Sequence, residues 1–97
     1  MFNFFKKKEK EKRLKYKCPC CDYYTFTQKP IGKYDICPVC FWEDDPFQAE
    51  NPDLEGMSNE ISLNQARENY KKFGACEERL IESVRPPNED ELTGLDG

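Results

Sequence analysis

The sequence predicts a small α+β domain: a β-hairpin with two cysteine knuckles, a long acidic loop, and one or two C-terminal helices. Two observations carry this prediction: four of the six cysteines form two evenly spaced pairs, and the clearest helical pattern begins after Ser62. The chain of 97 residues allows one small domain. A core of this size rarely contributes more than about 3–5 kcal/mol, so a cross-link between segments is expected.

The charge of the chain is unevenly distributed. Residues 1–17 carry eight Lys/Arg and two Glu, whereas the rest carries seven Lys/Arg and seventeen Asp/Glu, within a formal net charge of −4. This composition divides the sequence into a basic N-terminal arm (1–17), a cysteine-rich domain (18–85) and an acidic tail (86–97). The tail has few apolar residues, which predicts disorder.

The cysteine spacing is typical of a metal site. Two C-x-x-C pairs, each called a knuckle here, are separated by fifteen residues: Cys18, Cys21, Cys37 and Cys40. This pattern is typical of a zinc ribbon, in which each knuckle turns two thiolates toward one ion. The chain has no histidine, so we expect one structural Zn²⁺ with four thiolate ligands. Its formal charge of about −2 would be softened by lysines such as Lys17 or Lys33.

A redox reading of the same residues stays open, because "CPCC" and "CPVC" both have the C-P-x-C form of a dithiol oxidoreductase. That chemistry needs a helix directly after the motif. The N-terminus lacks the order of a secretory signal, since "MFNFF" precedes the lysines. We therefore expect a cytoplasmic protein, in which cysteines stay reduced. Cys20 is then a spare thiol beside the site, and Cys76 a buried apolar residue.

Secondary structure is predicted by turn and helix signals. Aromatic and β-branched residues flank the turn sequence "KPIGK", which predicts a hairpin with strands near 23–28 and 33–37. Residues 41–61, called the acidic loop here, show no periodic pattern of apolar residues that would indicate a helix or a strand. Ser62 and Gln65 form a capping box for a helix that ends at Gly74. A second, shorter helix is expected over 75–84, before Pro86 and Pro87.

Three blocks, "CPCCDYYTF", "YDICPVCFWEDDP" and "SLNQARENYKKFGA", resemble the bacterial cysteine-rich CPCC family over about residues 16–87. This resemblance implies a small metal-binding module and supplies neither an activity nor a substrate. A glycine commonly follows the first motif in that family, whereas Asp22 stands here. Because Asp tolerates the left-handed conformation better than most residues, we expect the turn to survive.

The segment after the second knuckle offers a candidate interaction surface, formed by Trp42, Glu43, Asp44 and Asp45. Arg67, at the edge of the predicted helix, is expected to pair with Asp44 or Asp45. We interpret Glu43, Asp44 and Asp45 either as residues that form a turn and cap a helix or as residues that bind a partner. Two alternatives to a non-enzymatic interaction module remain: a hydrolase-like site at Glu43, Asp44 and Asp45, and a thiol switch at Cys20.

The expected partner is a protein. The acidic body makes nucleic acid an unfavourable ligand despite the lysine-rich arm. Residues 2–17 combine phenylalanines and lysines, a composition that suits weak contact with an anionic membrane surface.

Overall fold

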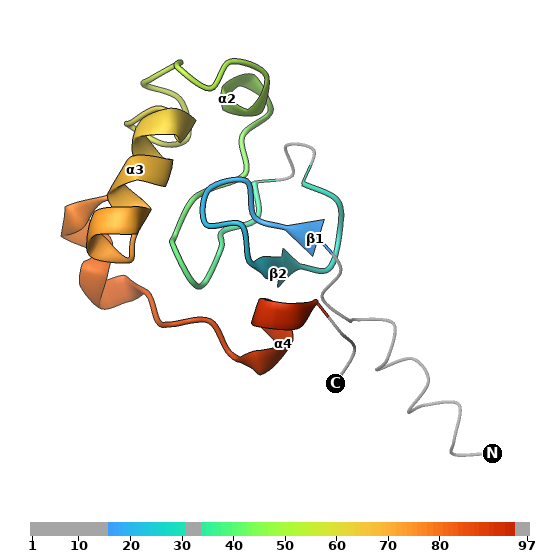
Figure 1. Cartoon of the computed structure of the whole chain (residues 1–97). Coiled ribbons are helices and arrows are strands. Elements are labelled where there is room, and N and C mark those ends of the chain that lie inside the picture. The colour runs from blue at the N-terminus through green and yellow to red at the C-terminus, as the bar shows by residue number, and fades with distance from the viewer. Residues whose placement is uncertain (1–15, 31–33, 95–97) are drawn as a thin grey trace.

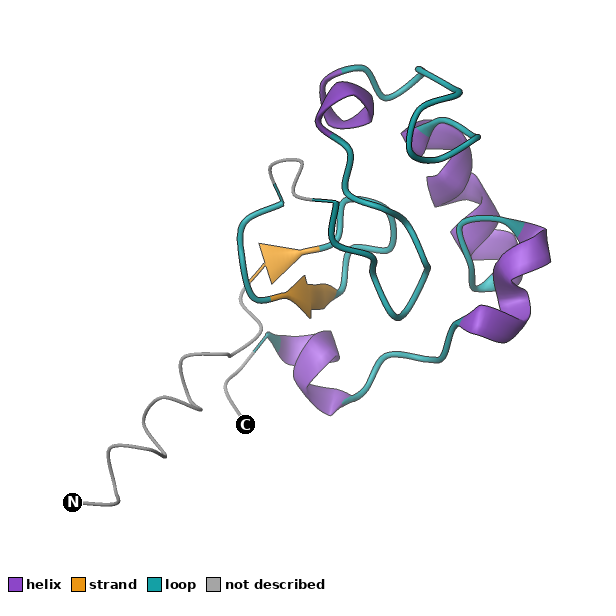
Figure 2. Cartoon of the chain, turned by 180° about the vertical axis from the view of Figure 1, so that it is seen from behind, coloured by secondary structure: helices purple, strands orange, loops and turns teal. Residues whose placement is uncertain are grey.

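The computed structural model describes residues 16–30 and 34–94. Two short strands and the two knuckles lie at the centre, and the helical segments surround them (Figures 1 and 2). In chain order the elements are β1 (Tyr16–Lys17), β2 (Tyr24–Phe26), α2 (Pro46–Glu50), α3 (Leu63–Phe73), the 3₁₀ helix η1 (Glu78–Ser83) and α4 (Glu89–Thr93). The predicted class, a small α+β domain with a hairpin, is confirmed.

The strands do not pair as predicted. β1 pairs with β2 in an antiparallel sheet around the first knuckle, and a single bridge joins Ile36 to Glu43 around the second. The expected hairpin between 23–28 and 33–37 is therefore wrong for the described residues. Each knuckle reverses the chain by itself, so the segments on its two sides become neighbours and pair locally.

The acidic loop contains a helix that the sequence pattern did not reveal. Pro46 occupies the first turn of α2, and the Asp45 carboxylate caps it by accepting from the N–H groups of Phe47 and Gln48. With five residues, α2 is too short to show a helical period. The interpretation of Asp-Asp-Pro as cap chemistry is thus confirmed for Asp45.

One buried side chain joins the turns of this loop. The Gln48 amide nitrogen donates to the carbonyls of Leu54, Asn59 and Ile61 at 3.0, 3.1 and 2.9 Å. Its amide oxygen accepts from the backbone and the side chain of Asn59 at 3.2 and 2.8 Å. Gln48 is fully buried, so these five hydrogen bonds hold a long irregular segment in one conformation.

Helix α3 has the predicted limits. The Ser62 hydroxyl accepts from the Gln65 N–H, and Gly74 ends the helix in the left-handed region with φ 77°. The Gln65 side chain donates to Asn69 instead of completing the predicted capping box. The shorter helix expected over 75–84 is present as η1, which packs against α3.

The residues after Pro87 are ordered as far as residue 94. Asn88 and Glu91 form a reciprocal capping box for α4, which packs against β2. Gly94 lies so close to the Tyr24 ring that an added Cβ would stand 2.7 Å from its Cγ. Part of the segment predicted as a disordered tail thus forms α4, and composition alone does not reveal that Glu91 becomes buried. Most of the predicted basic arm lies outside the described residues.

The core is small and is centred on sulfur. Its buried members are the six cysteines together with Phe26, Val39, Trp42, Leu63 and Ala66. Tyr23, Ile61, Tyr70 and Leu80 pack against this cluster and are partly exposed. Few large aliphatic side chains contribute, so the cysteine cluster itself has to hold the segments together.

Candidate metal centre

The first knuckle is a tight turn fixed by its own backbone. The Cys18 N–H donates to the Tyr23 carbonyl at 2.8 Å, and the Asp22 N–H donates to the Cys18 carbonyl at 2.8 Å. Asp22 adopts φ 71°, as expected for an Asp at a position where glycine is common. This geometry directs the thiols of Cys18 and Cys21 to the same side of the turn.

The second knuckle repeats this geometry. The Cys37 N–H donates to the Trp42 carbonyl at 3.0 Å, and the Phe41 N–H donates to the Cys37 carbonyl at 2.8 Å. Phe41 adopts φ 73°, which is unusual for an aromatic residue and corresponds to Asp22 in the first knuckle. Two turns with the same hydrogen bonds and the same left-handed residue thus present their thiols to a shared centre.

The four sulfur atoms meet between the knuckles. The Sγ atoms of Cys18, Cys21, Cys37 and Cys40 all lie within 4.8 Å of one another, and all four residues are buried. Two of the separations join opposite knuckles: 3.6 Å from Cys18 to Cys40 and 3.7 Å from Cys21 to Cys37. A tetrahedral ion with sulfur at about 2.3 Å needs sulfur atoms roughly 3.8 Å apart. The cluster therefore fits one tetrahedral metal ion.

Two polar groups outside the cluster form hydrogen bonds with its sulfur atoms. The Thr25 hydroxyl lies 3.2 Å from the Cys37 Sγ, and the Cys20 N–H donates to the Cys18 Sγ at 3.4 Å. The pKa of Cys37 lies far below its usual range, because its sulfur accepts hydrogen bonds from Cys18 and the other clustered thiols and from Thr25. Donors of this kind stabilise the thiolate form that binds metal.

The two other cysteines lie beside the cluster. Cys76 is buried, as predicted, and its N–H donates to the Cys40 carbonyl at 2.8 Å. Burial raises the pKa of its thiol to about 12, and the charge of Cys20 adds to the shift. Cys20 is 6% exposed and lines a pocket of about 380 Å³ together with Cys21 and Arg67.

The redox alternative requires a helix directly after a C-P-x-C motif. Here the first knuckle leads into β2 and the second into the Glu43 bridge, and α2 begins only at Pro46. Neither motif therefore has the helix dipole that lowers the pKa of a catalytic thiol.

The residues predicted to form an interaction surface after the second knuckle are largely buried. Trp42, Asp44 and Asp45 are 1%, 1% and 2% exposed, and Glu43 is half-buried. The Asp45 carboxylate also accepts from the Ser58 N–H at 3.1 Å, in addition to capping α2. Burial raises the pKa of Asp45, but the hydrogen bonds from Ser58, Gln48 and Phe47 outweigh it and the pKa is lowered. These residues fold the loop inward, so a partner cannot contact Trp42.

Arg67 was predicted to pair with Asp44 or Asp45, and this is wrong. Its Nε donates to the Pro19 carbonyl at 2.9 Å and its Nη1 to the Asn64 Oδ1 at 3.0 Å. The residue instead ties α3 to the first knuckle. The prediction failed because a helical residue's charge indicates an interaction but not the direction of its side chain.

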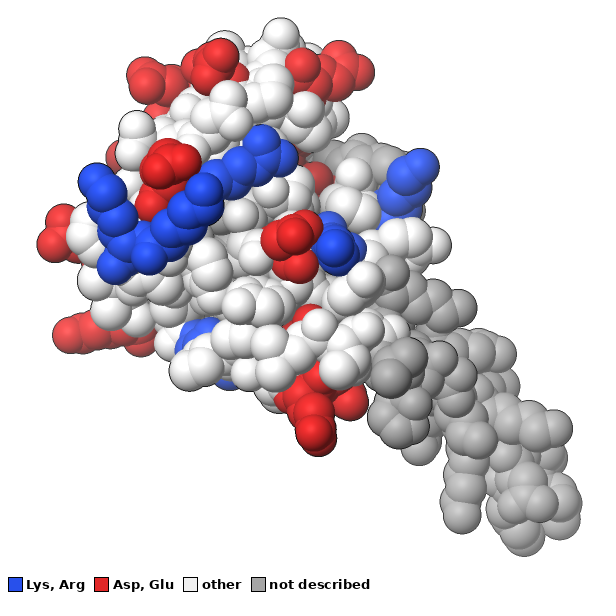
Figure 3. Space-filling model, in the orientation of Figure 1, with Lys and Arg blue, Asp and Glu red and all other residues white. Residues whose placement is uncertain are grey.

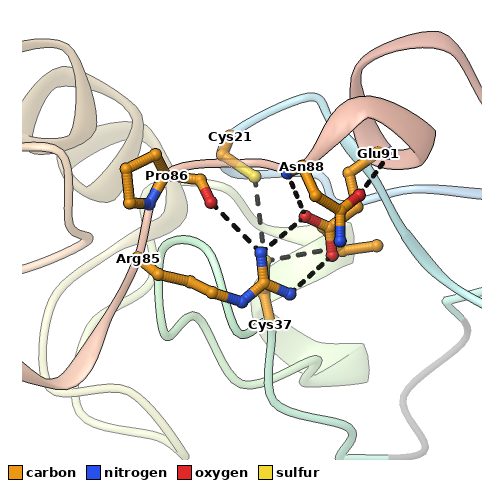
Figure 4. A network of polar contacts seen from close by, with 7 residues as sticks. Cys21, Cys37, Arg85, Pro86, Asn88 and Glu91 are labelled. Atoms are coloured by element: carbon orange, nitrogen blue, oxygen red, sulfur yellow. Dashed lines mark hydrogen bonds and ion pairs between the residues drawn. The ribbon is translucent and has the colours of Figure 1, made fainter.

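Arg85 was missed by sequence reasoning. Its Nη1 and Nη2 donate to the two carboxylate oxygens of Glu91, both at 2.8 Å. Figure 4 shows this pair in the same close-up as Cys21 and Cys37. The pKa of Arg85 is raised, chiefly by the hydrogen bond to Glu91, and the charge of Cys37 adds to the shift. No spacing pattern in the sequence predicts the position of Arg85, since this residue follows Cys40, the last cysteine of the second knuckle, by 45 positions.

Comparison with known protein families identifies the family of this chain. The model of the family described as cysteine-rich CPCC matches residues 16–91, which include both knuckles and extend to Glu91. The chain belongs to the cysteine-rich CPCC family. No curated protein matches this CPCC chain. Among the helices of its described residues, none has the length and apolar character that crossing a membrane requires.

Proposed function

We propose that this CPCC protein binds one structural Zn²⁺ through Cys18, Cys21, Cys37 and Cys40. The observation that carries the proposal is the convergence of four buried sulfur atoms within 4.8 Å, presented by two equivalent knuckles. Soft thiolates in a tetrahedral set select zinc or iron among the common metals. Zinc suits this protein because it needs no redox partner and stabilises small folds directly.

The chemistry of the site favours a structural role for the ion. Four protein ligands leave no position at which water or a substrate could bind, so the ion itself would activate neither. Glu43, Asp44 and Asp45 are poorly placed to act as a hydrolase site, since Asp44 and Asp45 are buried and Asp45 caps α2. We infer a non-enzymatic module that binds a protein partner in a reducing, cytoplasmic environment.

The surface supports a partner with basic groups. Acidic side chains gather around α2 and its loop, whereas basic side chains lie along α3 (Figure 3). Because Trp42 is buried, the proposed contact surface consists of the exposed acidic side chains around α2 and its loop. The same charges disfavour nucleic acid.

Substitution of one ligand tests the proposal against a matched control. Cys37→Ser should abolish stoichiometric metal and the folded circular dichroism spectrum, because the ion supplies much of the folding free energy. Cys20→Ser makes the same chemical change at a buried cysteine outside the ligand set, and should retain one zinc per chain by elemental analysis. Equal metal loss in both variants would contradict the ligand assignment, and iron in the purified protein would contradict the choice of zinc.

The thiol switch remains a second candidate because of the pocket beside the first knuckle. Cys20 and Cys21 both line it, so an oxidant such as peroxide would reach a ligand thiolate and a spare thiol at one place. Oxidation of that thiolate would release the metal.

A further inference from the structure

A buried carboxylate lies beside the proposed metal centre. The Glu91 side chain is 4% exposed, and both its oxygens accept from Arg85 at 2.8 Å. The Asn88 N–H donates to the same carboxylate at 2.9 Å. The pKa of Glu91 is lowered, first by the hydrogen bonds from Arg85, while burial and the charge of Cys37 act in the opposite direction. Glu91 is thus a buried anion whose charge is compensated by Arg85.

Arg85 lies where two negative groups would otherwise repel each other. A tetra-thiolate Zn²⁺ centre has a formal charge of about −2, and a buried charge without compensation is strongly unfavourable. Two other described cations lie at the first knuckle and bond to groups of that turn: Lys17 is 3.8 Å from the Asp22 carboxylate, and Arg67 donates to the Pro19 carbonyl. Arg85 pairs instead with Glu91 on α4, and Figure 4 draws this pair together with Cys21 and Cys37 of the two knuckles.

We propose that Arg85, held in place by Glu91, is the outer counter-charge of the metal centre, so that metal binding and the docking of α4 stabilise each other. The proposal rests on the proposed zinc site. It makes Arg85 a positioning residue for the centre and makes α4 the element that positions Arg85.

The coupling follows from the contacts of α4. The Arg85–Glu91 pair joins α4 to the segment before it, and α4 with the following Gly94 packs against β2 at Tyr24. β2 in turn carries Thr25, which bonds to Cys37. When the thiolates bind the ion, their negative charge increases the attraction for Arg85. Since coupling between two equilibria is reciprocal, undocking α4 should weaken metal binding by the same factor.

The chain offers a matched control for Arg85. Arg79 forms an equivalent two-bond pair with Glu77, at 3.0 and 3.1 Å, on the surface. Zinc affinity would be measured on the full chain by competition with a chromophoric chelator. Arg85→Met should bind zinc about 10- to 100-fold more weakly, the usual effect of removing an outer-shell partner. Arg79→Met should stay within about twofold of wild type.

A double variant separates two roles of Arg85. If Arg85 serves only to neutralise Glu91, Arg85→Met with Glu91→Gln should bind zinc as well as Glu91→Gln alone. The proposal requires the double variant to bind about tenfold more weakly than Glu91→Gln, because the centre has also lost its cation. Equal affinity of these two proteins would overturn it.

Hydrogen exchange of the zinc-loaded proteins provides a second readout. In Arg85→Met the amides of Leu92 and Gly94, bonded within α4, should lose protection while the Gly74 amide at the end of α3 keeps it. Unchanged protection of α4 would contradict the coupling. If Arg85→Met does not fold, Arg85→Gln removes the charge but keeps a polar side chain, and wild-type affinity in that variant would also overturn the proposal. A wild-type chain that binds no zinc would instead refute the proposed function.

Discussion

The hydrogen bond between Thr25 and Cys37 provides a direct probe of the metal centre. The Thr25 Oγ1 lies 3.2 Å from the Cys37 Sγ, and Thr25 is 8% exposed. In a metal-bound cluster the sulfur is a thiolate without a proton, so the hydroxyl must donate. Thr25→Val replaces the hydroxyl with a methyl group of similar size and leaves the rest of the cluster in place. It therefore tests this single interaction.

The size of the effect follows from the charge of the acceptor. A hydrogen bond to a charged group contributes about 1.5–3 kcal/mol, and each 1.4 kcal/mol corresponds to a factor of about ten in affinity. Thr25→Val should therefore weaken zinc binding by about 10- to 100-fold in chelator competition. Thr27→Val, at an exposed position on the same segment, should leave the affinity unchanged. An equal affinity of Thr25→Val and wild type would refute the role of this bond.

Three other predictions concern residues around the centre. Gln48→Met removes five hydrogen bonds of a buried side chain. It should lower the free energy of unfolding of the zinc-loaded protein by about 3–5 kcal/mol in denaturant titrations, and an effect below about 1 kcal/mol would contradict this prediction. Cys20→Ser should slow zinc release by peroxide, followed with a zinc-sensitive dye, and an unchanged rate would exclude the switch. The pKa of Cys76 is raised to about 12 in the folded protein from an ordinary value of 9.0, so between these values only the unfolded thiol loses its proton. The free energy of unfolding should therefore fall as pH rises above 9.0, and Cys76→Ala should reduce that fall; an identical pH dependence in both proteins would contradict the shift.

Local patterns were sufficient to predict the cluster of four cysteines and the main helix. Cys18 and Cys21 meet at one turn because two residues separate them, and the same spacing operates at Cys37 and Cys40. The Ser62 cap and the Gly74 stop likewise depend on neighbours within one helical turn. Such features are visible in a sequence because the interacting groups are close along the chain.

The features that were mispredicted depend on contacts between distant segments. Arg67 reaches Pro19, 48 positions earlier in the chain, and nothing in its own segment indicates that acceptor. Trp42 looked like a binding residue, but it is buried in the sulfur-centred core. The ordered α4 depends on Arg85 compensating Glu91, and residue composition alone cannot show that two opposite charges meet.

Metal content and free thiols of the protein, purified without added metal, test the central claim most directly. Elemental analysis of the native protein and thiol counting after denaturation with a chelator would be made on the same sample. The account predicts one zinc per chain and six reduced cysteines, in agreement with six free cysteines in the structure. A protein without bound metal, in which Cys18 and Cys21 or Cys37 and Cys40 form a reversible disulfide, would contradict it.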